Sequence, residues 1–314
     1  MDKISIIVPC LNEQEAIPVY YGEIVKIMEI MKGTEFELLF VDDGSEDDTL
    51  KELRELAGKD PRCGYLSFSR NFGKEAAIYA GLSRSSGDYV AVMDVDLQDP
   101  PSLLPQMYHL LLQEEWDCVA TRRADRKGES GFRSFLSESF YKVMNKISQT
   151  TIVEGARDYR MMKRKMVDAV LSMSEYNRFS KGIFQWVGFR TKWMEFENRN
   201  RCAGETKWSL KKLFSYSLEG ITGFSVAPLS LASIAGAVFC LIAFGMLLFD
   251  MGNILTGGGK MEGWFFPVCI IFLVSGVQLL CTGIVGQYLS KTYLETKHRP
   301  IYILKESSQQ ENAV

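Results

Sequence analysis

The sequence predicts an α/β domain with a mostly parallel sheet, followed by a hairpin of two transmembrane helices. Over roughly the first 200 residues, short apolar runs typical of strands alternate with helical patterns. This alternation is typical of βαβ units, whose strands are parallel. Beyond residue 223 the composition changes, and two long runs without a charged residue follow.

Five apolar segments in the first half have the composition of strands: 4–9, 36–42, 64–69, 89–94 and 117–122. Helical patterns occupy the intervals at about 13–31, 46–58, 74–86 and 101–114. In such folds, ligands bind beyond the carboxyl ends of the parallel strands. We therefore expect the functional residues in the segments that follow the strands: 9–13, 42–45, 70–74 and 94–98.

The two charge-free runs, 224–249 and 264–289, predict the membrane hairpin. Each exceeds the roughly 20 apolar residues that span a bilayer, and both are longer than the buried core helices that are the alternative interpretation. Lysines and arginines flank the outer ends of the pair, which by the positive-inside rule places these flanks and the N-terminal half in the cytoplasm.

These patterns divide the chain into four parts. We expect a cytoplasmic α/β domain at 1–207, an amphipathic helix at 208–223, the spans within 224–289 and a cytoplasmic tail at 290–314. The segment 208–223 combines apolar residues at helical spacing with two lysines, so it fits a helix lying in the membrane interface. An ordinary surface helix is the alternative.

The composition restricts the chemistry to carboxylates. The chain has 314 residues, a formal net charge of -3 and only two histidines. This charge gives no signal for nucleic acid binding, and two histidines argue against a His-centred triad or a His-rich metal site. The seven cysteines are scattered without a C-x-x-C pair, which fits reduced thiols acting as small apolar residues.

The stretch "VAVMDVDLQDPP" predicts a metal site. Asp94 and Asp96 end an apolar strand, and side chains two residues apart on an extended segment point to the same side. Two close carboxylates raise each other's pKa unless a cation lies between them. Oxygen ligands suit Mg²⁺ or Mn²⁺, and Gln98 adds a neutral oxygen. A solvated acidic turn is the alternative.

Two further loops follow strands and could hold a nucleotide. In "FVDDGSEDDT", Gly44 permits a tight turn, and Ser45 is expected to cap the next helix with Asp48 as its acidic partner. Capping leaves Asp42 and Asp43 unexplained, so one of them is expected to contact a ligand such as a base or ribose. In "VPCLNEQEAI", Asn12 either caps a helix or belongs to a nucleotide-binding loop.

With these clusters in order, the chain resembles the family-2 glycosyltransferases of GT-A, Rossmann-like fold. It is most similar to the polyprenyl-phosphate glycosyltransferases, the group that includes dolichol-phosphate-mannose-synthase-like enzymes and bactoprenol glucosyltransferases. The resemblance covers nearly the whole chain and rests on these stretches: "SIIVPCLNEQEAI", "LFVDDGSEDDT", "RNFGKEAAIYAGLSRSSGDYVAVMDVDLQDPP", "ARDYRMMKR", "NRCAGETKWSLKKL" and "YLSKTYLETKHRPIYIL".

The resemblance implies a role for each matching residue. Asp94, Asp96 and Gln98 would surround the metal and the donor diphosphate, and Asp158 and Arg160 would be the acid and its basic partner at the reaction centre. The resemblance also implies other substrate contacts. Pro9, Asn12, Glu13 and Asp42 would line the nucleotide pocket, and Asp43 and Lys74 would be further substrate contacts. Arg122 and Arg133 would bind the acceptor phosphate, and Arg201 and Lys207 would belong to a basic loop that closes over the phosphates. For the basic segment that holds Arg122, a solvated loop is the alternative.

The implied reaction is the inverting transfer of a sugar from a nucleotide sugar, with UDP-glucose expected, to undecaprenyl or another polyprenyl phosphate. The product would be a lipid-linked sugar for envelope glycosylation at the cytoplasmic face of a bacterial plasma membrane. Because the acceptor phosphate is already ionised, Asp158 is expected to act either as a base or as an orienting group. The resemblance also implies a dimer or tetramer.

Two other functions fit the sequence less well. A processive polysaccharide synthase usually carries a Q-x-x-R-W motif, and this chain has only the fragment "FQWVG". A non-catalytic, membrane-anchored scaffold that keeps the nucleotide-binding fold would not need Asp94, Asp96 and Asp158, and all three are present.

Overall fold

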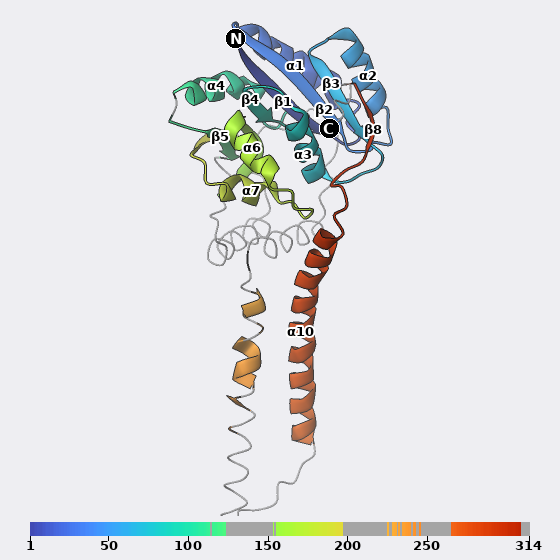
Figure 1. The fold of residues 1–314 in the computed structure, drawn as a ribbon, viewed down its shortest axis with the longest axis vertical. Helices are drawn as coiled ribbons and strands as arrows, with labels where there is room; N and C mark the ends of the chain where they lie inside the picture. The colour runs from blue at the N-terminus through green and yellow to red at the C-terminus, as the bar shows by residue number, and fades with distance from the viewer. Residues whose placement is uncertain are drawn as a thin grey trace, which may run out of the picture.

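A computed structural model describes residues 1–113, 115–123, 155–196 and 265–308, together with 153, 225 and short stretches between 228 and 245. Within these residues, eight strands form a single sheet in the order β7-β5-β6-β4-β1-β2-β3-β8. Helices cover both faces of the sheet, and one long helix, α10, extends away from it (Figure 1).

The first half confirms the predicted alternation of strands and helices. The elements in order are β1 (Asp2–Cys10), α1 (Ala16–Ile30), β2 (Thr34–Asp42), α2 (Thr49–Lys59), β3 (Cys63–Phe68), α3 (Lys74–Arg84) and β4 (Tyr89–Val92). These four strands are parallel. The helix expected at 101–114 is a 3₁₀ turn, η1 (Pro101–Leu103), followed by α4 (Leu104–Leu112).

The second half adds two antiparallel strands, β6 and β8, to a sheet that is mostly parallel, as predicted. It contains β5 (Cys118–Arg123), β6 (Ala156–Lys163), α6 (Arg164–Ser172), α7 (Ser180–Trp186), β7 (Thr191–Phe196) and β8 (Leu304–Ser307). Strand β6 runs antiparallel to both neighbours, and β8 runs antiparallel to β3. Antiparallel neighbours need no helical crossover. The regular alternation of strands and helices that predicted the parallel strands therefore could not predict β6 and β8.

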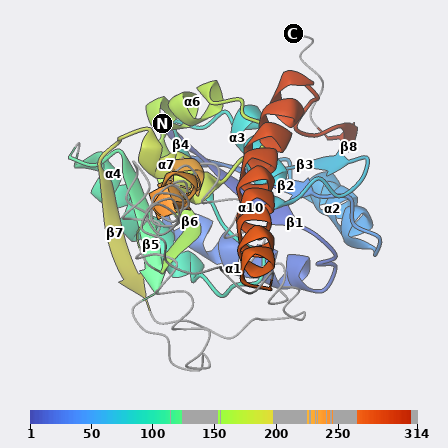
Figure 2. The same cartoon turned by 90° about the horizontal axis from the view of Figure 1, so that it is seen from below.

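Alternate residues of the central strands supply two apolar layers. In β1, Ile4, Ile6 and Val8 pack with α1 and α4 on one face, whereas Ile7 packs with α3 on the other. Side chains of a strand point alternately to its two faces, and a strand buried on both faces needs a continuous apolar run. Figure 2 shows these helices on both sides of the sheet.

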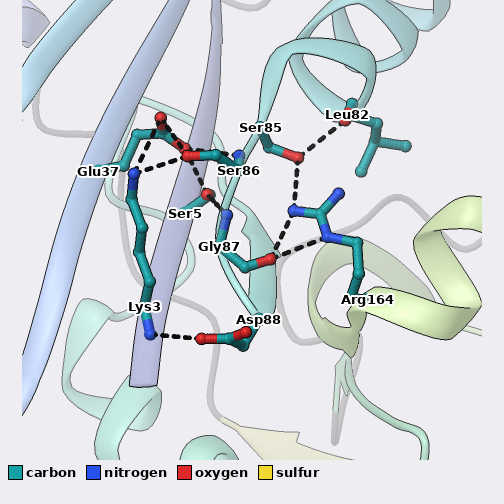
Figure 3. Close-up of polar contacts among 9 residues, drawn as sticks. All are labelled: Lys3, Ser5, Glu37, Leu82, Ser85, Ser86, Gly87, Asp88 and Arg164. Carbon is teal, nitrogen blue, oxygen red and sulfur yellow. Dashed lines mark hydrogen bonds and ion pairs between the residues drawn. The ribbon is translucent and has the colours of Figure 1, made fainter. Parts of the chain in front are cut away.

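A polar cluster closes the amino-terminal edge of the sheet, opposite the expected site (Figure 3). Glu37 on β2 accepts hydrogen bonds from Ser5 Oγ and from the Ser86 amide and hydroxyl. Arg164 donates from Nε and a terminal nitrogen to the Gly87 carbonyl, at 2.9 and 2.5 Å. These hydrogen bonds fix the start of β4 against β1 and β2.

Helix α10 (Phe265–Thr296) covers the second predicted membrane run. Its segment Leu273–Thr296, with a mean hydropathy of 1.3, is the one helix among the described residues that is long and apolar enough to cross a membrane. Leucines 273, 279, 280 and 289 are more than half exposed. Nearly half of the first run, 224–249, lies outside the described residues, so the two-span hairpin stays a prediction, as does the helix at 208–223.

Two contacts join α10 to the described parts of the first run. Tyr288 Oη donates to the Ser225 carbonyl at 2.5 Å, and Cys281 Sγ lies 3.5 Å from the Ala232 carbonyl oxygen. After α10 the chain returns to the sheet and adds β8 beside β3. The predicted tail 290–314 therefore contains a strand of the catalytic sheet.

Candidate active site

The centre of the candidate site is an ion-paired cluster of one lysine and two aspartates. Lys74 Nζ lies 2.6 Å from Asp158 Oδ2 and 2.7 Å from Asp94 Oδ1. Lys74 is the first residue of α3, Asp94 follows β4, and Asp158 belongs to β6. The ammonium group therefore joins three elements at the carboxyl edge of the parallel strands.

The antiparallel pairing of β4 with β6 explains why the two aspartates meet. The register pairs Val92 with Arg160 and Ala91 with Met161. Continuing it by two residues sets Asp94 opposite Asp158. Lys74 reaches both because Gly73, in the left-handed region with φ of 100°, turns the chain into α3 directly beside them.

The charges around Asp158 keep it ionised. Burial opposes the charge of this carboxylate, but Lys74, Lys181 and Arg160 together hold its pKa well below the ordinary value. Burial likewise acts against the Lys74 ammonium, and the Asp158 and Asp94 carboxylates outweigh it and raise the Lys74 pKa. The lysine thus neutralises the repulsion between the two carboxylates.

The remaining residues of "DVDLQDPP" form a second ionic layer. Asp96 is 5% exposed, and its Oδ1 accepts a hydrogen bond of 3.1 Å from the Gln98 amide. Asp99 forms an ion pair of 2.8 Å with Arg157, and the Gln98 side-chain oxygen lies 3.4 Å from the same guanidinium. Burial raises the Asp99 pKa to about 6, although Arg157 acts in the opposite direction.

The donor set fits a hard divalent cation that shares its coordination with a substrate. Within the described residues, no group of three or more His, Cys, Asp or Glu side chains could hold a metal on its own. Mg²⁺ is commonly bound through one or two carboxylates plus substrate phosphates. Asp94 and Asp96 supply two carboxylates, whereas Gln98 is directed to Arg157. The metal set Asp94, Asp96 and Gln98 stays a prediction.

Asn12 connects the first two loops instead of capping a helix. It lies in the left-handed region with φ of 52°, and its Oδ1 accepts a hydrogen bond of 2.8 Å from the Glu46 amide. Its own amide donates to Ser45 Oγ at 2.9 Å. Helix α1 begins later, with Glu15 as its N-cap residue. Of the two interpretations left open for Asn12, the structure therefore rules out the cap.

The capping box predicted for Ser45 and Asp48 is wrong. Helix α2 has Asp48 as its N-cap residue, without a side-chain cap. Ser45 is occupied with the Asn12 amide, and its own amide donates to Asp42 Oδ1 at 2.9 Å. The polar groups of Ser45 thus bond across the two loops, and it is Asp47 that meets the start of α2, where its Oδ1 accepts a hydrogen bond of 3.0 Å from the Thr49 amide.

Asp42 and Asp43 are both buried and both bound to protein groups. Asp42 Oδ2 accepts a hydrogen bond of 2.7 Å from Ser67 Oγ. Asp43 accepts from the amides of Phe72 and Gly73 at 2.7 and 3.0 Å. Burial raises the Asp43 pKa to about 6, against the lowering effect of these amides. Asp43 therefore shapes the loop before Lys74.

A surface hollow of about 320 Å³ opens beside this loop. Asp42, Ser45, Arg70 and Lys305 are among the residues that line it. Pro9 pairs with Val41 at the end of β1, and the Glu13 amide donates to Thr49 Oγ1 at 2.8 Å. The expected nucleotide-side residues thus belong to neighbouring loops, and their contacts with a nucleotide stay predictions.

Comparisons with known proteins identify the family. The model for glycosyl transferase family 2 matches residues 5–171. The chain belongs to glycosyltransferase family 2. It is 40% identical to the putative glycosyltransferase CsbB of Bacillus subtilis, over 97% of this chain and 92% of the relative.

Other relatives of this family-2 chain carry more specific names. It is 40% identical to the prophage bactoprenol glucosyl transferase homolog of Escherichia coli K12, over 96% of this chain and 98% of that protein. The bactoprenol glucosyl transferase of Shigella phage SfV is also 40% identical, over 98% and 99% of the two chains. A solved structure, glucosyl-3-phosphoglycerate synthase from Mycobacterium tuberculosis, aligns at a TM-score of 0.47 with 21% identity, over 70% of this chain and 78% of that one.

The predicted arginines of this glycosyltransferase have different surroundings. Arg160 is 1% exposed, donates to the carbonyls of Arg157 and Asp158, and lies over the Phe184 ring at 3.9 Å. It supports the Asp158 backbone from the core side. Arg122 pairs with Glu195 at 2.5 Å on the neighbouring strand. Arg133, Arg201 and Lys207 lie outside the described residues.

Three residues of the site were not anticipated from the sequence. Arg157 holds Asp99, and Lys181 on α7 contributes to the low Asp158 pKa. Glu75, next to Lys74, accepts hydrogen bonds from the amide and hydroxyl of Ser180 at the start of α7. The signal for Arg157 was its place beside Asp158, whereas nothing local marks Lys181.

Proposed function

We propose that this glycosyltransferase transfers glucose from UDP-glucose to a polyprenyl phosphate, such as undecaprenyl phosphate, with inversion at the anomeric carbon. The observation that carries the proposal is the cluster of Asp94, Lys74 and Asp158 at the carboxyl edge of the sheet. It occurs in a chain that is 40% identical, over nearly its full length, to proteins named bactoprenol glucosyl transferase.

In the proposed reaction an oxygen of the acceptor phosphate forms a bond to the anomeric carbon. The bond between that carbon and the donor diphosphate breaks, and UDP leaves with the electron pair. The acceptor oxygen carries no proton at neutral pH, so no strong base is needed. The enzyme must instead hold two anions together and stabilise the leaving group.

Asp158 then acts as an orienting group. A carboxylate with a pKa well below its ordinary value is a weak proton acceptor. Its ion pair with Lys74 fixes the ammonium at the site, where it is available to the donor phosphates. Arg160 positions the Asp158 backbone, and Arg122 and Arg133 are proposed to meet the acceptor phosphate.

Asp94 and Asp96, with Gln98, are proposed to hold Mg²⁺ or Mn²⁺ together with the donor. The cation would neutralise charge that develops on the leaving diphosphate. Pro9, Asn12, Glu13, Asp42 and Asp43 are proposed to shape the nucleotide side, and Arg201 and Lys207 to close over the phosphates.

The proposed setting is the cytoplasmic face of a membrane. The exposed apolar surface of α10 suits contact with lipid, and the helix ends beside the catalytic domain, where Glu295 accepts the Tyr176 amide at 3.0 Å. The isoprenoid chain of the acceptor could stay in the bilayer while its phosphate reaches the site. The same proposal includes two membrane spans and domain boundaries at 207, 223 and 289. It also includes assembly into dimers or tetramers.

The test is a transfer assay with the full-length protein in detergent. Undecaprenyl phosphate and Mn²⁺ or Mg²⁺ are incubated with radiolabelled UDP-glucose, UDP-GlcNAc or GDP-mannose in separate reactions, and label is followed into the organic phase. We expect transfer from UDP-glucose, abolished by EDTA and in Asp96→Ala. Asp168→Asn, an exposed substitution on α6, is the matched control and should retain activity. Preferential transfer from another donor, or none at all, would contradict the proposal.

A further inference from the structure

The chain that follows α10 becomes the edge strand of the catalytic sheet. Strand β8 (Leu304–Ser307) pairs antiparallel with β3. The Ser69 amide donates to the Ile303 carbonyl at 2.9 Å, and the Tyr65 amide donates to Ser308 Oγ at 2.7 Å. The Ser308 amide donates a hydrogen bond of 3.0 Å to the Tyr65 carbonyl. Residues 303–308 are thus bound alongside the chain from Tyr65 to Ser69, which includes the carboxyl end of β3.

Side chains reinforce this backbone pairing at both ends. Arg54 on α2 forms a two-pronged ion pair with Glu306, at 2.8 and 2.6 Å. Tyr302 stacks on Phe68 with ring centroids 4.9 Å apart and an interplanar angle of 17°. Both planar fork pairing and aromatic stacking depend on geometry as well as on burial. They hold the segment in one register on the sheet.

The bound segment leads directly to the loop that carries Lys74. Phe68, which stacks on Tyr302, also meets the edge of Phe72 at 5.8 Å. The amides of Phe72 and Gly73 are held by Asp43, and the next residue is Lys74. A chain of contacts therefore runs from Tyr302 to the Asp94–Lys74–Asp158 cluster.

The same segment also borders the hollow beside Asp42. Lys305 lines it together with Arg70, which follows β3. A Cβ atom on Gly44 would lie 2.4 Å from the Arg70 carbonyl carbon, so the loops after β2 and β3 are in close contact. A shift of β3 at its carboxyl end would consequently displace both loops.

We propose that residues 301–308 are a positioning element of the donor site: they hold the loop 69–73, and with it Lys74, in the arrangement that binds a nucleoside diphosphate. The inference rests on the proposed function only for the identity of the donor. It makes the part of the chain beyond the membrane helix a component of the catalytic domain.

The test measures loop order and nucleotide affinity in full-length variants. In Tyr302→Ala we expect faster hydrogen exchange at the Phe72 and Gly73 amides and Mn²⁺-dependent UDP binding weakened by roughly three- to tenfold, the size of change typical for coupled contacts. Tyr302→Phe keeps the stacked ring and should restore both values. The KM for UDP-glucose should rise more than the KM for the lipid acceptor.

A second variant guards against a general folding defect. Arg54→Ala removes the fork to Glu306 at an exposed position and should give the same pattern to a smaller degree. Lys59→Ala, which breaks the Lys59–Glu55 surface pair of the same helix, is its matched control and should change neither quantity. Lys305→Met tests direct contact: if it alone reproduced the full loss of UDP affinity, the positioning role would be overturned.

The outcomes separate this inference from the proposed function. Unchanged exchange at Phe72 and Gly73 in Tyr302→Ala, with a lower Tm alone, would show that the segment only stabilises the fold. If wild type transfers glucose and the variants bind UDP normally, the inference alone fails. If wild type transfers no glucose while the variants still loosen the loop and weaken UDP binding, the proposed function fails and the inference stands.

Discussion

Lys74 and Asp158 form an ion pair of 2.6 Å between residues that are 84 positions apart in the chain. The lysine contacts Asp94 as well, so that a protein cation occupies the place between the acids. We infer that donor binding redistributes these charges, with the ammonium passing part of its interaction to the incoming diphosphate.

Replacing Lys74 with methionine should reduce glucose transfer by a factor on the order of a hundred or more, as expected for loss of a preorganised charge. The substitution keeps an unbranched side chain but removes the ammonium group, which leaves Asp94 and Asp158 to repel each other, so the Tm should fall as well. Transfer assays and thermal unfolding measure the two effects. Full activity in Lys74→Met would show that the lysine has no role in the reaction.

The titration of Asp158 should not contribute to the pH dependence of kcat. Because its pKa lies well below the ordinary value, the carboxylate is ionised across the neutral range. Asp158→Asn should therefore lower kcat without changing the shape of the profile between about pH 6 and pH 8, where an unperturbed carboxyl is also ionised. An acidic limb present in wild type and absent in Asp158→Asn would identify Asp158 as a base.

Asp60 should support stability only above the acidic range. Hydrogen bonds from Arg62 lower its pKa to about 2 from the ordinary 3.8. A group with a depressed pKa in the folded state stabilises above its unfolded pKa and loses this contribution as the pH falls towards its folded pKa. Asp60→Asn should cost about 1 kcal/mol at pH 7, after allowance for the exposed Arg62. Unfolding followed from pH 7 to pH 2 should show the difference shrinking below about pH 4.

Gly87→Ala should destabilise the fold by roughly 1 to 3 kcal/mol, as overpacking does. A Cβ atom at this position would lie 2.6 Å from the Ser5 amide nitrogen and 2.7 Å from the Lys3 carbonyl oxygen. These are backbone atoms, which cannot move aside cheaply within the polar cluster of Figure 3.

Gly22→Ala is the matched control for this change. Gly22 lies within α1 and has open space around it, so alanine should stabilise the helix slightly through its higher propensity. Thermal unfolding in detergent measures both variants. Equal Tm values for Gly87→Ala and wild type would show that β1 and the turn before β4 can separate without cost.

The alternating strands and helices of the fold could be predicted from the sequence. Strands buried on both faces and amphipathic helices have clear periods, and residues 4–94 followed them closely. The polar turns were less predictable because Asn12, Ser45 and Asp42 bond across loops, whereas capping rules describe only local partners. The sequence patterns therefore located the loops correctly, but they predicted the wrong hydrogen-bond partner for Ser45.

The residues of the candidate site could be predicted from the sequence, but the ion pairs between them could not. Asp94 was expected at the metal and the donor diphosphate, Lys74 at a substrate, and Asp158 at the reaction centre. Their mutual contact depends on the antiparallel register of β4 and β6, which no local pattern reveals. Strand β8 was also hidden, because "LKES" is short and polar and becomes a strand only where β3 offers a free edge.

The position of β8 after α10 also sets an order of events during synthesis. Strand β3 keeps an open edge until α10 and the segment beyond it have been synthesised and that segment has folded back. A nascent chain that lacks this segment exposes unpaired backbone groups that favour aggregation. Completion of the sheet thereby depends on a segment that is synthesised more than 200 residues after the strand it pairs with.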